Sequence, residues 1–328
     1  MDHVLPSRIA GLRQGLYPAV RTIVLDALAG GVDSTLPTNE VYRARSGMTT
    51  GTIQRAIDLL RERGALGIAS RGQLGRQIKS IDLGECWRSA GLAPVELALP
   101  PLGRVEVEAL SDYIVRSLVE LGVPYTIRPF HGGPTRLRQV VAGVSDMTIV
   151  SSVTFDNSGL APELGEPNVR KLAPHTYYGP GRVAVVRRAG DTEPPRRIAL
   201  DMDSLDHVIL TKTEFPDAGG YDYVPVTYAQ TLAFLVGGRL DAAVWHVIRS
   251  PIPPALAGLT VEPIQSEALT RDGEDLTRAV VVISPQRREL RSVLQQLEFG
   301  PVAELQGEAI AVDAAAQQAL LGIERAED

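Results

Sequence analysis

The chain of 328 residues has one cysteine, five histidines and no apolar run near the roughly 20 residues that a membrane helix needs. The lone Cys86 excludes an intramolecular disulfide and a cysteine-based zinc cluster, and such sparing use of cysteine is typical of a reducing cytosol. The first residues, MDHVLPSRIAGLRQG, lack the continuous apolar segment of a signal peptide. We therefore expect a cytoplasmic protein that binds no membrane, metal or cofactor.

Charge is ordinary in amount but uneven along the chain. The net charge is −6, yet residues 1–80 contain eleven Arg or Lys against six Asp or Glu. The head therefore carries +5 and the rest of the chain −11. A basic head on an acidic body is expected when one domain contacts phosphate and the other does not.

Periodicity in the first 64 residues predicts three short helices. Residues 17–28, YPAVRTIVLDAL, repeat apolar side chains at steps of three and four, as an amphipathic helix does. Thr38 is placed to cap a second helix that ends at Gly47, and Thr49 to cap a third that ends at Gly64. Three helices with short connections match the helix-turn-helix plan, in which the third helix lies in the DNA major groove.

The third predicted helix carries polar side chains away from its apolar stripe. Gln54 and Arg55 offer donors and acceptors for purine edges, while Thr50 and Thr52 suit phosphate. The alternative is an ordinary solvent-exposed face on a three-helix bundle.

The stretch SRGQLGRQI, residues 70–78, follows this helix and predicts a glycine-bearing hairpin between strands at 66–69 and 76–81. Such a hairpin is a wing, whose tip would bring arginines to the DNA backbone or minor groove. A Walker loop and a dinucleotide loop need glycine spacings that are absent. Gly72 and Gly75 do match the G-x-x-G of an RNA-binding KH loop, but that loop joins two helices.

The segment LPTNEVYRARSGMTTGTIQRAIDLLRERGAL, continued by SRGQLGRQI, resembles the GntR-type winged helix and, more closely, the YhfZ group of regulators. That resemblance covers about residues 20–80 and implies DNA binding. Many relatives have Ser-Arg where Thr49 and Thr50 stand, so a contact by that arginine is not carried over. The residues expected to bind DNA are Thr38, Thr49, Thr50, Gly51, Thr52, Gln54, Arg55, Arg71, Gly72, Gln73 and Arg76.

After an expected linker at 83–94, strand-like and helical runs alternate, which is an α/β pattern. A unit of helix, glycine, aspartate and strand occurs at Gly143 and Asp146 and recurs 95 residues later at Gly238 and Asp241. Chance is the alternative, because glycine commonly ends helices. Two related lobes predict a periplasmic-binding-protein-like domain with a ligand cleft between them.

Three further stretches, TYYGPGRVAVV, ALDMDSLDHVILT and DAAVWHV, resemble the effector domain of the YhfZ group, and the whole arrangement is similar to LysR-type effector domains. The predicted fold class is α/β. A winged helix-turn-helix domain spans 1–82, and a two-lobed domain of the type 2 periplasmic-binding-protein kind spans 95–328.

Helix starts and strand ends point into the crevice of such a domain, which nominates cleft residues. Arg104 and Arg136 would suit a carboxylate or phosphate, and Asp201 or Asp203 an amine or hydroxyl. For each of these residues, the alternative to ligand contact is a role as a helix cap or in a surface ion pair. For Trp245, packing in a core is expected over stacking on the ligand. The full set is Arg104, His131, Gly132, Gly133, Thr135, Arg136, Ser151, Ser152, Asp201, Asp203, Ser204 and Trp245.

These patterns predict a DNA-binding transcription regulator that responds to a small, anionic effector and binds double-stranded operator DNA as a homodimer. One alternative is a body that only oligomerises. Another is an enzyme built on Asp201, Asp203, Asp206 and His207, but that spacing is typical of a capped helix start, and no enzymatic activity is expected.

Overall fold

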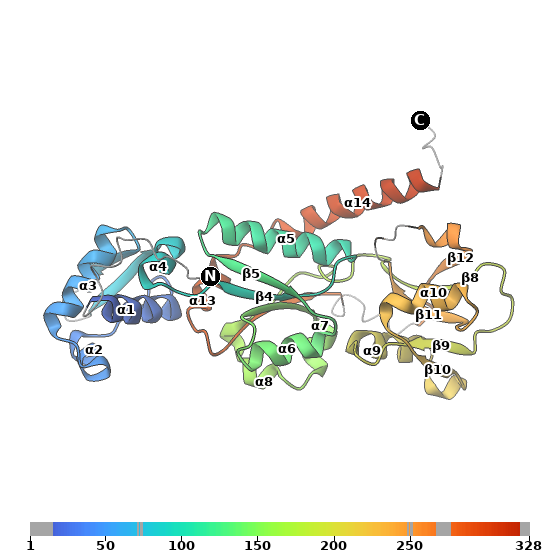
Figure 1. Ribbon diagram of the computed structural model, residues 1–328, viewed down its shortest axis with the longest axis horizontal. Helices are drawn as coiled ribbons and strands as arrows, with labels where there is room; N and C mark the ends of the chain where they lie inside the picture. Colours follow the sequence, from blue (N-terminus) through green and yellow to red (C-terminus); the bar gives the residue numbers. More distant parts are fainter. Residues whose placement is uncertain are drawn as a thin grey trace, which may run out of the picture.

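A small N-terminal head and a body of two lobes lie in a row in the computed structural model of this chain (Figure 1). The structure describes residues 16–70, 72, 75–247, 249, 252–266 and 277–321. Across those ranges, no helix combines the length and apolar character needed to cross a membrane.

The head contains the helices and the hairpin that the sequence predicts. Its elements are α1 (Leu16–Gly30), β1 (Thr35–Leu36), α2 (Asn39–Ser46), α3 (Thr50–Glu62), β2 (Leu66–Ser70), β3 (Arg76–Ile81) and α4 (Leu83–Ala90). The short strand β1 was not predicted; it pairs antiparallel with β3, which pairs antiparallel with β2. Three helices and this sheet together have the winged-helix arrangement.

Local signals account for the helix boundaries in the head. The hydroxyl of Thr38 accepts a hydrogen bond from the Val41 amide, and that of Thr49 accepts one from the Thr52 amide. Each such cap contributes about 1 kcal/mol. Gly47 ends α2 with φ of 68°, a left-handed conformation that favours glycine.

In the part of the chain that the structure describes, each lobe of the body is built around a five-stranded sheet. Lobe 1 has the strand order β5-β4-β6-β13-β7, and lobe 2 has β10-β9-β11-β8-β12. Lobe 1 comprises β4 (Val95–Leu99), α5 (Val105–Glu120), β5 (Tyr125–Pro129), α6 (Gly133–Val141), β6 (Met147–Ser151), α7 (Ser152–Asn157), α8 (Ala161–Leu164), β7 (Val169–Lys171), β13 (Ala279–Ile283) and α13 (Leu290–Gln296). Lobe 2 comprises β8 (Val183–Arg188), β9 (Arg197–Leu200), α9 (Leu205–Glu214), β10 (Asp222–Pro225), α10 (Thr231–Val236), β11 (Ala242–His246) and β12 (Leu259–Pro263).

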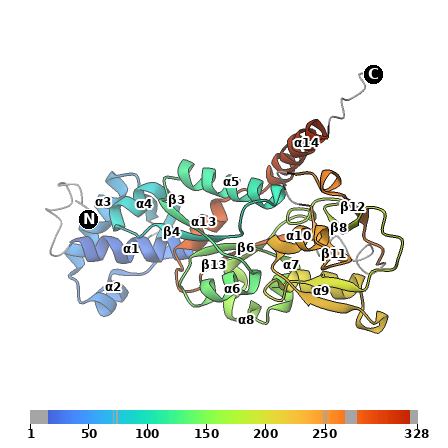
Figure 2. The same ribbon diagram turned by 45° about the vertical axis from the view of Figure 1, so that its right-hand side comes forward.

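The chain crosses from lobe 1 to lobe 2 between β7 and β8 and returns between β12 and β13. The last described helix, α14 (Val302–Leu320), packs along α5 and then projects beyond it (Figure 2). Two segments of the chain therefore connect the lobes.

The internal repeat that the sequence suggests has the same geometry in both lobes. Asp146 precedes β6, and its carboxylate accepts the amide of Glu96 on neighbouring β4 at 2.9 Å. Asp241 precedes β11, and its carboxylate accepts the amide of Arg197 on neighbouring β9 at 2.8 Å. Each aspartate thus caps the start of the adjacent parallel strand, which explains why the unit recurs.

The head is packed directly on lobe 1. Segment 83–94, the expected linker, consists of α4 and the residues that lead into β4, and Trp87 in α4 is buried. Helix α13 lies against α1, where the hydroxyl of Ser292 donates to the carbonyl of Leu28 at 2.6 Å. Because Leu28 is in the last turn of α1, this bond satisfies a carbonyl that the helix itself leaves free.

Candidate functional site

A cavity of about 190 Å³ lies between the lobes. Its walls come from the loop before α5 and the loop before α6 in lobe 1, and from the start of α9, the short 3-10 helix η5 (Tyr228–Gln230) and the end of β11 in lobe 2. The lining residues are Pro101, Leu102, Arg104, His131, Tyr178, Val183, Ser204, His207, Leu210, Tyr228, Ala229, Val244 and His246. Three residues predicted for the cleft, Arg104, His131 and Ser204, are therefore brought together.

Arg104 provides positive charge at this cavity. It stands immediately before α5, and its Nη1 donates to the hydroxyl of Tyr177 at 3.0 Å. Its guanidinium carbon lies 5.6 Å from the centre of the same ring. Within the described ranges no carboxylate forms an ion pair with it. Among the described residues these are its side-chain contacts, so its other N–H groups can meet an anion.

Asp201 holds the two lobes together and has no free oxygen for a ligand amine. Its Oδ2 accepts from Nε2 of His131 at 3.0 Å and from the Tyr228 amide at 2.9 Å, and its Oδ1 accepts from the Asp203 amide. Burial alone would raise the pKa of this carboxyl, but the bonds from His131 and the Tyr228 amide hold it below its usual value. The expected amine contact at Asp201 is thus replaced by a hydrogen bond between lobes.

Asp206 forms a second, fully buried bridge between the lobes. Its carboxylate accepts hydrogen bonds from Ser151 at 2.5 Å and from Thr154 at 2.7 Å, both in lobe 1. It also accepts from the hydroxyl of Tyr178 at 2.8 Å, in the segment that crosses between lobes. Ser151 was expected at the ligand; its hydroxyl instead accepts the Thr154 amide and donates to Asp206.

Two predicted contacts, Arg136 and Trp245, face the protein interior rather than the cleft. Arg136 is 1% exposed, and it donates to the carbonyls of Phe130 at 2.8 Å and Ile149 at 3.1 Å. Its side chain lies on the same face of α6 as Val140, four residues later, which is buried. Trp245 packs in the core of lobe 2. Neither residue lines the cavity, which corrects the expectation for both.

The remaining predicted residues surround the contact between lobes. Gly132 has φ of 81°, and a Cβ there would lie 2.7 Å from the carbonyl oxygen of Asp203 in lobe 2. Gly132 therefore allows the lobes to touch, whereas a Cβ at Gly133 would lie 2.8 Å from the Thr154 side chain of the same lobe, so Gly133 allows α6 to pack closely against α7. Thr135 accepts a bond from Arg138 in the same helix. Ser152 is buried at the start of α7, whereas the Asp203 side chain is exposed.

Two histidines outside the predicted cleft set, His207 and His246, line the cavity. Nε2 of His207 donates to the carbonyl of Val244 at 3.1 Å, while its Nδ1 accepts the Asp201 amide. Nε2 of His246 faces Oε1 of Glu106 at 3.4 Å. Burial lowers the pKa of both rings. Strand alternation was the available signal for His246, because Val244 and His246 must face the side opposite to Trp245.

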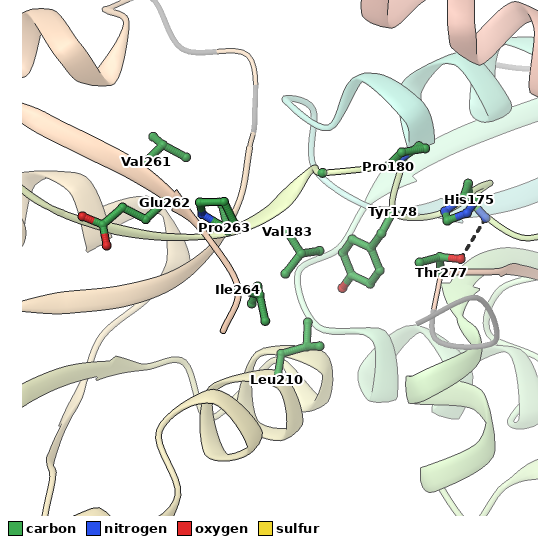
Figure 3. Close-up of a pocket in the computed structure, with 13 residues that line it drawn as sticks. His175, Tyr178, Pro180, Val183, Leu210, Val261, Glu262, Pro263, Ile264 and Thr277 are labelled. Carbon is green, nitrogen blue, oxygen red and sulfur yellow. Dashed lines mark hydrogen bonds between the residues drawn. The ribbon is translucent and has the colours of Figure 1, made fainter. Parts of the chain in front are cut away.

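A second cavity, of about 410 Å³, lies beside the segments that join the lobes (Figure 3). Pro263, the last residue of β12, and Ile264, which follows it, face Tyr178 and Val183 across the cavity, and the latter two also line the first cavity. The segment between β7 and β8 thus borders both cavities through Tyr178, so a change in the angle between lobes would alter each.

In the head, the caps and the exposed helix residues lie where the sequence predicts. Thr38 and Thr49 cap α2 and α3, and Thr49 also contacts the Thr52 hydroxyl at 3.0 Å. Thr50 and Arg55 are exposed on α3, with Nε of Arg55 donating to the carbonyl of Gly51.

Arg76 does not extend from the wing tip, because two side chains of the head hold it. Its guanidinium donates to Asn39 in α2 and to Gln54 in α3, both at 2.8 Å. These bonds use the acceptor oxygen of Gln54 as well, which leaves Gln54 facing Arg76 and Asp58. The expected roles of Arg76 at the DNA backbone and of Gln54 at a base edge are therefore corrected to a contact that joins α2, α3 and β3.

The wing turn uses its glycines as expected. Gly72 and Gly75 have φ of 60° and 84°, and the amide of Gly75 donates to the carbonyl of Gly72 at 3.2 Å. The predicted DNA contacts of Arg71 and Gln73 lie outside the described residues.

Comparison with known protein families matches residues 82–317 to the YhfZ C-terminal domain. The chain belongs to the YhfZ family. Over 257 residues it is 28% identical to the "Uncharacterized protein YhfZ" of Escherichia coli (strain K12), covering 76% of this chain and 80% of that protein.

Among solved structures, the YhfZ of Shigella flexneri matches with a TM-score of 0.53 and 23% identity over 71% of this chain and 96% of that chain. The alkanesulfonate-binding protein SsuA of Xanthomonas axonopodis pv. citri, bound to MOPS, matches with a TM-score of 0.48 and 13% identity over 71% of this chain and 81% of that one. The α/β class and the periplasmic-binding-protein-like body predicted from the sequence are confirmed.

Proposed function

We propose that the protein is a DNA-binding transcription regulator whose affinity for DNA changes when a small anionic effector enters the cleft between its lobes. The observation that carries the proposal is Arg104, a cation without a carboxylate partner at a cavity between two lobes, in a chain with a winged-helix head. In this proposal the body senses its ligand and does not catalyse a reaction.

The charge and surface of the head support DNA as its partner. Residues 1–80 carry +5, whereas the rest of the chain carries −11. The first turn of α3 exposes Thr50 and Gly51, and Arg55 follows with only a carbonyl of its own helix as partner. Such a turn offers amides, hydroxyls and a guanidinium to phosphate and base edges.

Packing between the head and lobe 1 supports a route from the cleft to the DNA. Helix α13 contacts α1, and α4 contacts both α1 and lobe 1. The head therefore moves with lobe 1, and closure of lobe 2 onto the effector changes the direction in which the head points relative to lobe 2. In a homodimer joined through the body, that change would alter the spacing of the two recognition helices on operator half-sites.

DNA binding is tested by fluorescence anisotropy with the DNA upstream of the protein's own coding region at 50 and 200 mM salt. A head that contacts several phosphates loses affinity steeply between these concentrations. We expect Arg55→Ala to weaken binding and to reduce the slope of log affinity against log salt by about 1. Arg116→Ala is the matched control, because Arg116 is also an exposed helical arginine bonded only to the carbonyl four residues earlier.

Equal effects of the two substitutions would contradict the assignment of α3 to the DNA. An affinity that does not depend on salt would contradict DNA binding by the head altogether.

A further inference from the structure

We infer that the cleft selects a small monoanion with an uncharged, mainly apolar body, whose anionic group meets Arg104 of lobe 1 and Ser204 of lobe 2. This inference rests on the proposed function, and it names the chemical class of the effector. Arg104 precedes α5 and Ser204 caps α9, and both line the same cavity. Ser204 Oγ accepts the His207 amide, so its hydroxyl proton is left to donate.

The supply of positive charge limits the ligand to one negative charge. Of the described residues that line the cavity, Arg104 is the cation without an acidic partner. His131 is already paired with Asp201. His207 and His246 direct their Nε2 toward a carbonyl and a carboxylate, and burial favours their neutral forms. A second anionic group would be desolvated without a partner.

None of the described residues that line the cavity is acidic, which disfavours amino acids and other zwitterions. Asp201 receives three hydrogen bonds, and Asp206 receives three more. Oε1 of Glu106 accepts the Gly179 amide and faces His246 and Arg182, whereas its buried Oε2 has no hydrogen-bond partner, but Glu106 does not line the cavity. An ammonium group in the cleft would therefore find no carboxylate on the described walls of the cavity.

Both tyrosine hydroxyl groups of the walls are also used, which leaves Ser204 as the wall hydroxyl that can donate and disfavours sugars and polyols. Tyr178 donates to Asp206, and Tyr228 donates to the carbonyl of His246. The other walls are apolar side chains, and Leu102, 88% exposed, stands at the rim. These apolar walls are Pro101, Leu102, Val183, Leu210, Ala229 and Val244. A ligand body that needs no hydrogen bonds fits such walls best.

The test measures the binding of small probes to the full-length protein by calorimetry. The probes differ in charge and polarity. The monoanions are 3-phenylpropionate and 4-methylpentanoate; 3-phenylpropanamide is the neutral probe, phenylalanine the zwitterion, phenyl phosphate the dianion and gluconate the polyol acid. We expect at least one of the two monoanions to bind tenfold or more tightly than every other probe. Arg104→Gln should weaken that binding at least tenfold, Arg104→Lys should weaken it less, and Ser204→Ala should weaken it severalfold. Arg116→Gln, outside the cavity, should leave it unchanged.

Thermal unfolding of each variant without probe shows whether the fold is kept. If Arg104→Gln does not fold, Arg104→Lys, which retains the positive charge, still tests the contact with the anion. Tighter binding of phenylalanine, phenyl phosphate or gluconate would overturn the inferred ligand class, but the proposal that the cleft binds an effector would stand. Binding by none of the probes would also overturn it, as would equal binding to the Arg104→Gln and wild-type proteins. If a monoanion binds through Arg104 but DNA affinity does not respond, the ligand class stands and the proposed regulation fails.

Discussion

Replacing Asp206 should destabilise the contact between the two lobes more than replacing an exposed acidic residue near it. The buried carboxylate accepts hydroxyl bonds from Ser151, Thr154 and Tyr178. A hydrogen bond to a charged group contributes about 1.5–3 kcal/mol, and breaking a buried charged network typically costs about 3–5 kcal/mol. We therefore expect Asp206→Ala to lower the free energy of unfolding of the body by about 3–5 kcal/mol. Asp206→Asn keeps one carbonyl acceptor and should cost about 1–3 kcal/mol.

The two tryptophans of the chain make this change measurable in the body alone. Trp87 lies in α4 beside the head, whereas Trp245 lies in the core of lobe 2. In a Trp87→Phe background, urea unfolding followed by tryptophan fluorescence reports Trp245. Asp203→Ala is the matched control, because Asp203 is on the same loop but exposed, and it should change stability by less than about 0.5 kcal/mol. An Asp206→Ala effect no larger than that of Asp203→Ala would refute the reasoning.

Three further outcomes follow from buried groups. Burial raises the pKa of the Cys86 thiol to about 12, so a thiol reagent at pH 8 should modify it only as fast as the head unfolds; rapid modification of the native protein would contradict this. Although burial opposes it, hydrogen bonding to His246 lowers the pKa of Glu106 from 4.5 to about 2. Ionised Glu106 therefore stabilises the fold above about pH 4.5, by roughly 3 kcal/mol, and this contribution disappears as the pH falls toward 2. Urea unfolding should show Glu106→Gln less stable than wild type at pH 7 and closer to it at pH 3; a constant difference would disagree. Ser292→Ala, which removes the bond to Leu28, should increase hydrogen exchange at the end of α1 and leave lobe 2 unaffected.

The head could be predicted closely because its signals are local. Thr38, Thr49 and Gly47 fix helix ends by bonds or conformations within a few residues. What the sequence could not show is that β3 passes α2 and α3 closely enough for Asn39 and Gln54 to hold Arg76. That contact joins residues far apart in the chain, so no periodicity records it.

In the body, the sequence contains a pattern that predicts the true position of some residues that were assigned wrongly, but not of others. Arg136 shares a helix face with Leu137 and Val140, and this spacing predicts burial. Trp245 alternates with the cavity-lining residues of β11, so its inward position was also available from the sequence. Asp206 had no such signal, because its three partners come from other elements that only the folded chain brings together.

The most direct test of the account measures DNA affinity and effector binding in one experiment. Anisotropy of the upstream DNA is titrated with wild-type protein and with Arg104→Gln, each with and without saturating amounts of the monoanion that calorimetry identifies. A coupling of about 1 kcal/mol corresponds to a roughly fivefold change in affinity, so we predict at least that change for wild type. Arg104→Gln should bind the DNA with the affinity of effector-free wild type and should not respond. An equal response in both proteins, or none in wild type saturated with the monoanion, would contradict the account.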